Sequence, residues 1–143
     1  MEGYLYPETY KFSPDSSIKT IINKLIYTLS EKIEPYKDEI ESNNLTFHQI
    51  LSLASDFEVE GNNEADRKLI AGVFLNRLRN GMSLGSDVTT YYAVKKALNS
   101  GELYYYDLAF ISFYNTRLSS MAGKINVGPI CSPSIMSIKA VLE

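Results

Sequence analysis

The chain has 143 residues, 45% of them hydrophobic and 22% charged, and 14 Lys and Arg against 17 Asp and Glu give a formal net charge of -3. These values are typical of one ordinary soluble domain, so we expect residues 1–143 to form a single domain. The basic residues do not cluster into a stripe, so we expect no nucleic-acid partner. No apolar run approaches the roughly 20 residues that span a membrane, and no signal peptide is visible.

The first 45 residues predict packing elements without chemistry. The stretch "GYLYPETYKF" alternates aromatic and polar residues around Pro7, which indicates an extended segment or an edge strand. Apolar residues then recur at helical spacing from Ile18 to Ile33, and Pro35 ends or kinks that helix. A shorter polar helical piece continues to "ESNN".

Two further helices are expected in the middle of the chain. Thr46 is a good N-cap, and Gln49 three residues later completes a capping box for a helix that ends near Gly61. The sequence "NNEADR" starts the next helix, which continues through Arg79 until "NG" stops it.

The remaining elements are shorter and are separated by long loops. Asp87 can cap a helix over residues 88–98, and "NSG" breaks it. "ELYYYDLAF" predicts a short strand or a helical turn, residues 112–134 are typical of a loop, and Pro133 with Ser134 introduces the last helix. The fold class expected is therefore mainly α, with minor strands and with loops long enough to suggest a function.

Cysteine and histidine are too scarce for several kinds of site. The single cysteine, Cys131, excludes an internal disulfide and is expected to be a small buried residue. The single histidine, His48, leaves no Cys/His metal cluster and falls in the first turn of a predicted helix, where a surface or capping role is expected. We therefore expect no metal ion bound by Cys and His.

Three acids in "LASDFEVEG" occupy different positions on the helix that carries them. On a wheel of 100° per residue the apolar face consists of Phe47, Ile50, Leu53, Ala54 and Phe57. Asp56 points nearly opposite, towards solvent. Glu58 lies on one border of the apolar face, and Glu60 lies on the other border at the end of the helix.

Glu58 is the acid that combines an apolar flank with a position inside the helix. A carboxyl group that is half-buried against apolar atoms has a raised pKa, as a general acid near neutral pH requires. The alternative is that Glu58 ends the helix and pairs with a neighbouring Arg or Lys. Helical periodicity alone favours this alternative, because structural ion pairs are commoner than catalytic acids.

Five motifs in order make the chain resemble a known family. "EGYLYPETY", "LASDFEVEG", "VFLNRLRNGMSLGSDVTTYYA", "YNT" and "GPICSP" are similar to the approximate pattern EGYLFPDTY, LASIVEKE, VFxNRLxxGMxLQSDPTVxYA, SPYNTY and GLPPGPIxNPG of the MltG/YceG endolytic murein transglycosylases. The resemblance covers nearly the whole chain. It implies a lysozyme-like helical catalytic domain that acts on peptidoglycan strands.

The same resemblance implies a larger protein. Family members carry this domain after a membrane anchor and a LysM-like part, at the extracytoplasmic face of the bacterial membrane and near the cell-wall synthesis machinery. The chain begins abruptly at "MEGYLYPETY" and stops inside a predicted helix, "SIMSIKAVLE". We therefore expect it to be a segment of a longer, membrane-anchored protein.

Carried onto this sequence, the family's catalytic glutamate falls on Glu58, and its second acid falls on Glu60. Glu58 would protonate the glycosidic oxygen between N-acetylmuramic acid and N-acetylglucosamine. As a carboxylate it would then accept the proton of the sugar's own 6-hydroxyl, which closes a 1,6-anhydro ring. One carboxyl group serves both steps because the nucleophile is not water, whereas glycoside hydrolases commonly need two carboxyls. The resemblance therefore implies a lyase-type reaction that uses no cofactor.

Asp87 matches the aspartate of the family's "SDPT" and is a candidate for binding the sugar, together with Ser86 and Thr90 on the same wall. The alternative is that Asp87 is a helix N-cap with Thr90 at the third position, and the sequence leaves both interpretations open.

The "YNT" motif supplies the remaining candidates for substrate binding. Asn115 can donate and accept towards an acetamido group, and Tyr114 can cover an apolar sugar face beside Thr116. The alternative is a loop that Asn115 holds by bonding to nearby backbone.

The chain also departs from the family pattern around the expected cleft. "IVEKE" is replaced by "DFEVE", "QSDPT" by "GSDVT", and "GLPPGPI" by "KINVGPI", which lacks two prolines. These departures keep two alternatives open: a catalytically weak peptidoglycan-binding or scaffold module of the same fold, and a lysozyme-type hydrolase that uses water.

Overall fold

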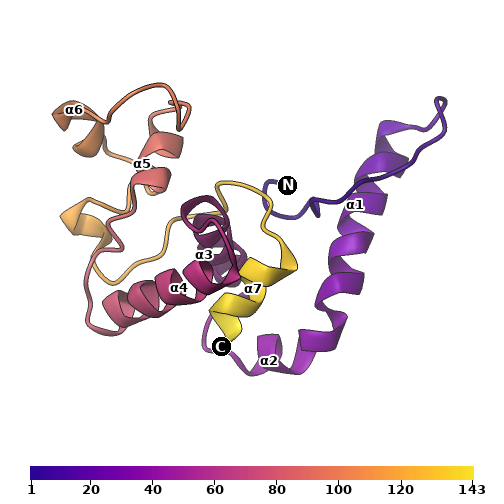
Figure 1. The fold of residues 1–143 in the computed structure, drawn as a ribbon, viewed down its shortest axis with the longest axis horizontal. Helices are drawn as coiled ribbons and strands as arrows, with labels where there is room; N and C mark the ends of the chain where they lie inside the picture. The colour runs from indigo at the N-terminus through magenta and orange to yellow at the C-terminus, as the bar shows by residue number, and fades with distance from the viewer.

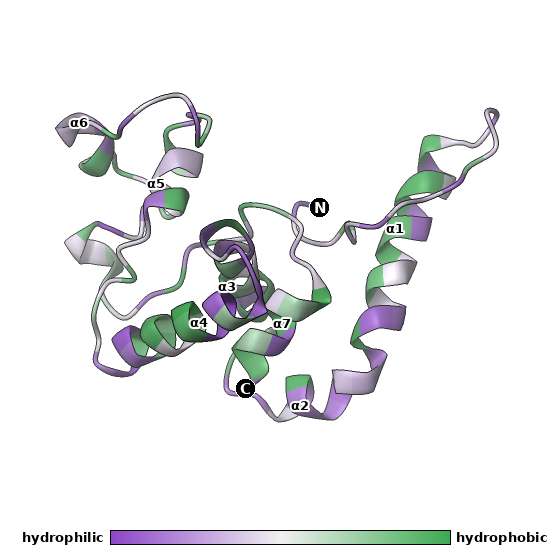
Figure 2. Cartoon of the chain, viewed as in Figure 1, coloured by the Kyte–Doolittle hydropathy of each residue, from purple (hydrophilic) through white to green (hydrophobic).

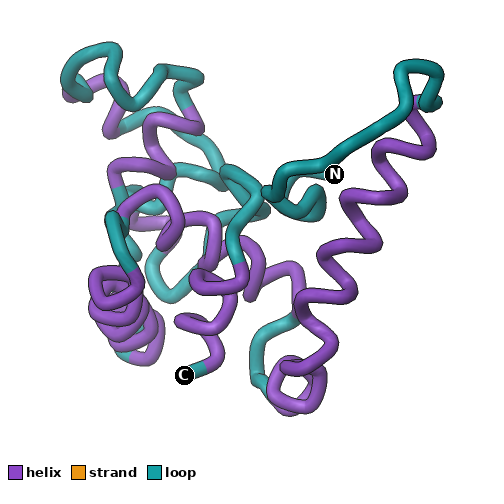
Figure 3. Tube along the Cα trace, turned by 45° about the vertical axis from the view of Figure 1, so that its right-hand side comes forward, coloured by secondary structure: helices purple, strands orange, loops and turns teal.

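The computed structural model describes residues 1–143, which form helices joined by loops and no strands (Figure 3). The elements are α1 (Ile18–Ile33), η1 (Glu34–Tyr36), α2 (Lys37–Ser42), α3 (Phe47–Glu60), α4 (Glu64–Arg79), α5 (Asp87–Ala93), α6 (Tyr105–Leu108), η2 (Ser119–Met121) and α7 (Ile135–Leu142). The mainly helical class is confirmed. The expected minor strands are absent, and residues 1–17 form turns and irregular backbone instead.

The helices α3, α4 and α7 pack against one another in the middle of the molecule (Figure 1). Helix α1 stands on one side with the N-terminal segment running along it, and α5 and α6 lie at the opposite end. Figure 2 shows hydrophobic residues along α3, α4 and α7. None of the helices is both long and apolar enough to cross a membrane.

Helix α3 is held at its start by the predicted capping box. The Thr46 side chain accepts from the amide of Gln49, and the Gln49 side chain accepts from the amide of Thr46 at 2.9 Å. These bonds satisfy amides that the first helical turn leaves free. The helix ends at Glu60, and Gly61 follows as its C-cap, as predicted.

The core is centred on α3. The predicted apolar face is confirmed, because Ile50, Leu53, Ala54 and Phe57 are completely buried and Phe47 packs against the core from the edge. The Phe57 ring meets Phe74 of α4 edge to face, with 5.4 Å between ring centroids.

Burial of α3 extends to every side of the helix between Ile50 and Phe57. Asp56 is therefore completely buried, and the prediction that it faces solvent is wrong. The wheel located the apolar face correctly, but the loops that cover the polar face come from distant parts of the sequence.

Helix α5 is shorter than predicted and begins one residue earlier. Ser86, not Asp87, occupies the N-cap position, and Asp87 is the first helical residue. The helix stops at Ala93 because Lys95 adopts a left-handed conformation with φ of 57°. The amide of Lys96 then donates to the carbonyl of Tyr91 at 3.0 Å, which is the pattern of a Schellman motif.

The other sequence-based predictions of helices are confirmed. Helices α1, α2, α4 and α7 occupy the expected ranges, and "ELYYYDLAF" holds the helical turn α6. The segment 112–134 is loop apart from the short η2 turn.

Candidate functional site

The end of α3 lies between the starts of two other helices, and each side carries one glutamate. Glu58 faces the start of α7, where its Oε2 accepts from the amide of Ser134 at 2.9 Å. Glu60 faces the start of α5, where its Oε1 accepts from the hydroxyl of Ser86 at 2.6 Å. Residues two apart on a helix point in different directions, so the two carboxylates serve two different surroundings.

Both oxygens of the Glu58 carboxylate have hydrogen-bond partners in the protein. Its Oε2 also accepts from the hydroxyls of Ser134 at 2.6 Å and Ser137 at 2.7 Å. Its Oε1 pairs with Arg67 of α4 at 2.8 Å. The Glu58 side chain is 24% exposed, so it is only partly buried.

The pKa of Glu58 is lowered from its ordinary value. Partial burial raises it, but the hydrogen bonds from Ser134 and Ser137 and the positive charge of Arg67 together outweigh that effect. The prediction of a raised pKa is therefore wrong, because the expected apolar flank is lined with donors. The pairing with a nearby basic residue, which periodicity alone favoured, is present.

Glu60 lines a pocket of about 390 Å³ between the end of α3, one face of α4 and residues 84–87. Asp87 opens onto the same pocket, and its side chain is 55% exposed. Arg117 donates from Nε to the Asp87 carboxylate at 2.6 Å. Two acids, one of them freely accessible, therefore meet at this surface.

Buried hydroxyls join the "SDVTT" and "YNT" motifs behind this surface. The amide of Ser86 donates to Thr116 Oγ1 at 3.0 Å, and the Thr89 and Thr116 hydroxyls are 2.8 Å apart. Thr90 donates to Asn115 Oδ1 at 2.9 Å. The two motifs are thus one structural unit.

Three predicted substrate-binding residues have no surface with which to touch a sugar. Thr90, Asn115 and Thr116 are completely buried. The Asn115 amide donates to the carbonyls of Leu108 at 3.0 Å and Phe110 at 2.8 Å, so its donors are already used. The prediction of direct sugar contact by these three residues is wrong, and the alternative in which Asn115 holds its own loop is observed.

Tyr114 is half-buried and is not among the residues that line the pocket with Glu60. Its ring packs against Tyr92 with 4.7 Å between centroids, and the Tyr92 hydroxyl bonds to the carboxylate of Glu2. Gly128 lies so close that a Cβ built there would be 3.0 Å from the Tyr114 oxygen and 3.4 Å from His48 Nε2. This aromatic corner joins the N-terminal segment, α5 and the loop 122–134.

Several residues around the two glutamates were not singled out by sequence reasoning. Ser134 was expected only at a helix start, and Ser137, Arg67 and Arg117 were not identified. The one available signal was the expectation that some Arg or Lys pairs with Glu58. Ser137 lies 79 residues from Glu58 in the sequence, so helical periodicity carries no information about it.

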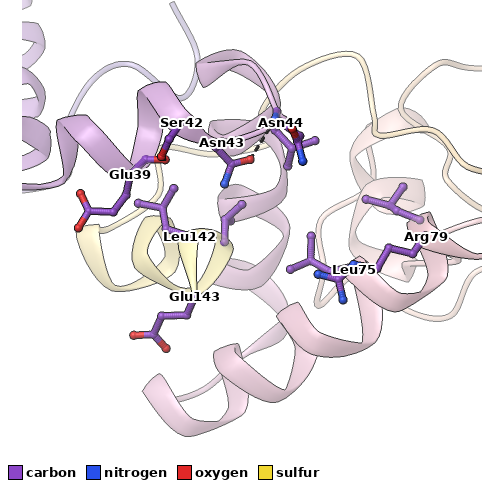
Figure 4. A pocket seen from close by; sticks show the side chains of 11 residues that line it. Glu39, Ser42, Asn43, Asn44, Leu75, Arg79, Leu142 and Glu143 are labelled. Carbon is purple, nitrogen blue, oxygen red and sulfur yellow. Dashed lines mark hydrogen bonds between the residues drawn. The ribbon is translucent and has the colours of Figure 1, made fainter.

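Other parts of the surface offer less chemistry. A pocket of about 490 Å³ lies between α2, α4 and α7 and contains none of the predicted site residues (Figure 4). No group of three His, Cys, Asp or Glu side chains is arranged to hold a metal ion. Burial raises the pKa of the Cys131 thiol to about 12, so it stays protonated and is a poor nucleophile.

Comparison with known proteins identifies the class. The model of the YceG-like family matches residues 1–143, and the chain belongs to this family. Two similar proteins are each named endolytic murein transglycosylase. The one from Bacillus subtilis strain 168 is 38% identical over 144 residues, and the one from Streptococcus pneumoniae D39 is 36% identical over 146 residues.

These comparisons cover the whole of this chain but only part of each relative. The chain spans 39% of the Bacillus protein and 26% of the Streptococcus protein. A crystal structure of a yceG-like protein from Listeria monocytogenes matches with a TM-score of 0.86 and 35% identity. That match covers 98% of this chain and 44% of the Listeria chain.

Proposed function

We propose that this chain carries the catalytic centre of an endolytic murein transglycosylase, a lyase-type enzyme that cuts peptidoglycan strands without water. The observation that carries the proposal is Glu58 at the end of α3, a partly exposed side chain whose carboxylate is oriented by Ser134 and Ser137. The names of the relatives from Bacillus and Streptococcus support it. No cofactor takes part.

The two oxygens of Glu58 have different tasks in this mechanism. Oε2 accepts three hydrogen bonds, which fix the orientation of the carboxylate. Oε1 has Arg67 as its partner, and it is the oxygen that carries the proton. The lowered pKa keeps Glu58 ionised near neutral pH, which is the form that takes the proton of the 6-hydroxyl.

The first step needs the protonated form, which the free protein disfavours. Protonation of Oε1 requires Arg67 to move away from it, since an acid proton and a guanidinium compete for one position. A bound glycan strand also excludes water and thereby raises the pKa of the carboxyl. The protonated Glu58 then donates to the glycosidic oxygen between N-acetylmuramic acid and N-acetylglucosamine, and the 1,6-anhydro ring closes.

Glu60, Ser86 and Asp87 form the substrate-binding wall in this proposal, and Tyr114 offers a second, aromatic contact at its corner with Tyr92. The accessible Asp87 carboxylate accepts from sugar hydroxyls, and Glu60 is held in place by Ser86. Thr90, Asn115 and Thr116 affect substrate binding indirectly. Their buried hydrogen bonds fix the position of the residues that contact the sugar.

The setting of the reaction follows from the same proposal. The substrate is the glycan strand of peptidoglycan. The longer protein is anchored in the bacterial membrane with this domain on the extracytoplasmic side, near the machinery of cell-wall synthesis.

Product analysis of the whole protein acting on purified glycan strands tests the function. Chromatography with mass spectrometry is expected to find 1,6-anhydro-N-acetylmuramic acid ends. Glu58→Gln is expected to lower their rate of formation by about 10²–10⁴-fold, as the loss of a general acid–base does. Glu41→Gln, at an exposed site in α2, is the matched control and should leave the rate unchanged.

Each alternative gives a different product pattern. Reducing-end N-acetylmuramic acid without anhydro ends would mean hydrolysis by water. Unchanged product formation in Glu58→Gln together with its loss in Glu60→Gln would move the acid to Glu60. Glycan binding without product in the wild type would support the catalytically weak binding or scaffold module.

A further inference from the structure

Two buried side chains that face each other each have one polar atom without a partner. Asp56 of α3 is completely buried, and Asn126 of the loop 122–134 is nearly so. The Asn126 Nδ2 donates to Asp56 Oδ1 at 3.3 Å and to the carbonyl of Gly128 at 2.9 Å. Asp56 Oδ2 and Asn126 Oδ1 have no hydrogen-bond partner in the protein.

The two unpartnered atoms are both acceptors, so what the pair lacks is one proton. An ionised carboxylate presents acceptors alone, and burying one without compensation is costly. A protonated carboxyl has one donor and one acceptor, as the carboxamide opposite it does. One proton on Asp56 Oδ2 therefore supplies the donor that the two unpartnered acceptors lack.

The surroundings of Asp56 contain no positive charge that would hold it ionised. None of its hydrogen bonds comes from an Arg, Lys or His side chain. The titratable group that acts on it is Glu60, one turn further along α3. Asp56 in turn acts on the Cys131 thiol of the loop 122–134. Burial raises the pKa of Asp56 well above its ordinary value, and the negative charge of Glu60 adds to the effect.

We propose that Asp56 is a neutral carboxylic acid that donates its proton to Asn126, and that this closed acid–amide pair fastens the loop 122–134 to α3. This inference is independent of the proposed function. It concerns two positions where the chain departs from the family pattern, since that pattern has Ile where Asp56 stands and Pro where Asn126 stands. The two departures meet across 70 residues of sequence.

The pair is one of several hydrogen-bonded contacts between α3 and the loop 122–134. His48 Nε2 binds the carbonyl of Val127 at 2.9 Å, and the amide of Ile130 donates to Ser55 Oγ at 3.0 Å. Asn126 lies two residues before Gly128, which packs against Tyr114. Loss of the Asp56 proton would therefore place two carboxylates one turn apart on α3 and loosen the loop that carries this aromatic corner.

The sign of the pH dependence follows from the raised pKa. The folded state binds the Asp56 proton more tightly than the unfolded state, in which the pKa is about 3.9. The contribution to stability is complete below that value and is lost as pH rises towards the pKa of the folded protein. Over this window the unfolding equilibrium constant rises by about tenfold per pH unit relative to a variant that cannot titrate.

Asp56→Asn is the variant that tests this, because a second carboxamide keeps one donor and one acceptor facing Asn126. Denaturant unfolding of the full chain is measured from pH 4 to pH 9. The free energy of unfolding of Asp56→Asn is expected to increase relative to that of the wild type as pH rises. Asp38→Asn, the same change at an exposed site in α2, is the matched control and should follow the wild type. Parallel pH curves for Asp56→Asn and the wild type would overturn the proposal.

A direct measurement keeps the test decisive if the variant folds poorly. The infrared spectrum of the wild-type protein at pH 7 is expected to contain the C=O band of a buried protonated carboxyl, and Asn126→Leu should shift or remove it. A wild-type spectrum without a protonated carboxyl band at pH 7 would overturn the proposal.

Discussion

Replacing Arg67 with Gln removes the positive charge beside Glu58 while keeping a side chain of similar length. The pair joins Arg67 Nη2 to Glu58 Oε1 at 2.8 Å, and the two side chains are 16% and 24% exposed. Removing one partner of a fully buried ion pair costs about 3–5 kcal/mol. This pair is partly solvated, so screening reduces the expected loss of unfolding free energy to about 1–3 kcal/mol, near that of a hydrogen bond to a charged group.

The same substitution has a predicted pH dependence. The pKa of Glu58 is lowered in the folded protein, so its contribution to stability is present above the unfolded pKa and is lost as pH falls through the folded pKa. Arg67→Gln raises the folded pKa towards the unfolded value. The stability difference between wild type and Arg67→Gln should therefore be largest near neutral pH and shrink as the pH falls below about 4.

Chemical denaturation at a series of pH values measures both effects. Lys68→Gln is the matched control, because it removes a positive charge at the next residue, where Lys68 pairs with the exposed Glu64 and Glu143. The reasoning is refuted if Arg67→Gln destabilises no more than Lys68→Gln at pH 7. It is refuted equally if the loss stays constant down to pH 3.

Three further substitutions probe the scaffold, each by the free energy of unfolding from denaturant titration. Phe57→Ala should cost about 3–5 kcal/mol, because the ring is completely buried against Phe74, and a loss below about 1 kcal/mol would contradict that packing. Thr46→Ala should cost about 0.5–2 kcal/mol by breaking the capping box of α3, whereas Thr46→Ser should keep most of the stability. Asn115→Ala should cost about 1–3 kcal/mol or more, because it leaves the carbonyls of Leu108 and Phe110 unpaired. A stable Asn115→Ala variant with impaired glycan binding would instead support direct contact between Asn115 and the sugar.

Local signals were sufficient for most helices. Thr46 and Gln49 identified the start of α3 because a capping box is made within four residues. The end of helix α5 could not be predicted from the sequence. The left-handed residue that ends it is Lys95, whereas Gly or Asn usually occupies such a position. The motif order that led to the family also came from the sequence alone, and the family is confirmed.

The site itself depended on contacts that sequence spacing does not contain. Glu58 was singled out for its place on the border of the apolar face inside the helix. Its surroundings are supplied by Arg67 nine residues away and by Ser134 and Ser137 more than 75 residues away. Those donors reversed the expected direction of its pKa shift. Asn115 shows the same limit, since a motif reveals which residue is present but not whether its amide points outwards.

The sequence by itself determined where α3 begins, which face of α3 is apolar and which family the chain belongs to, because these follow from local spacing and motif order. The tertiary structure alone decided the state of the three acids on α3. Asp56 became buried because the loop 122–134 covers the polar side of the helix, Glu58 became ionised among donors from α4 and α7, and Glu60 was turned towards Ser86 at the start of α5. The charge of a carboxyl group depends on the atoms that surround it in space, and those atoms come from every part of the chain.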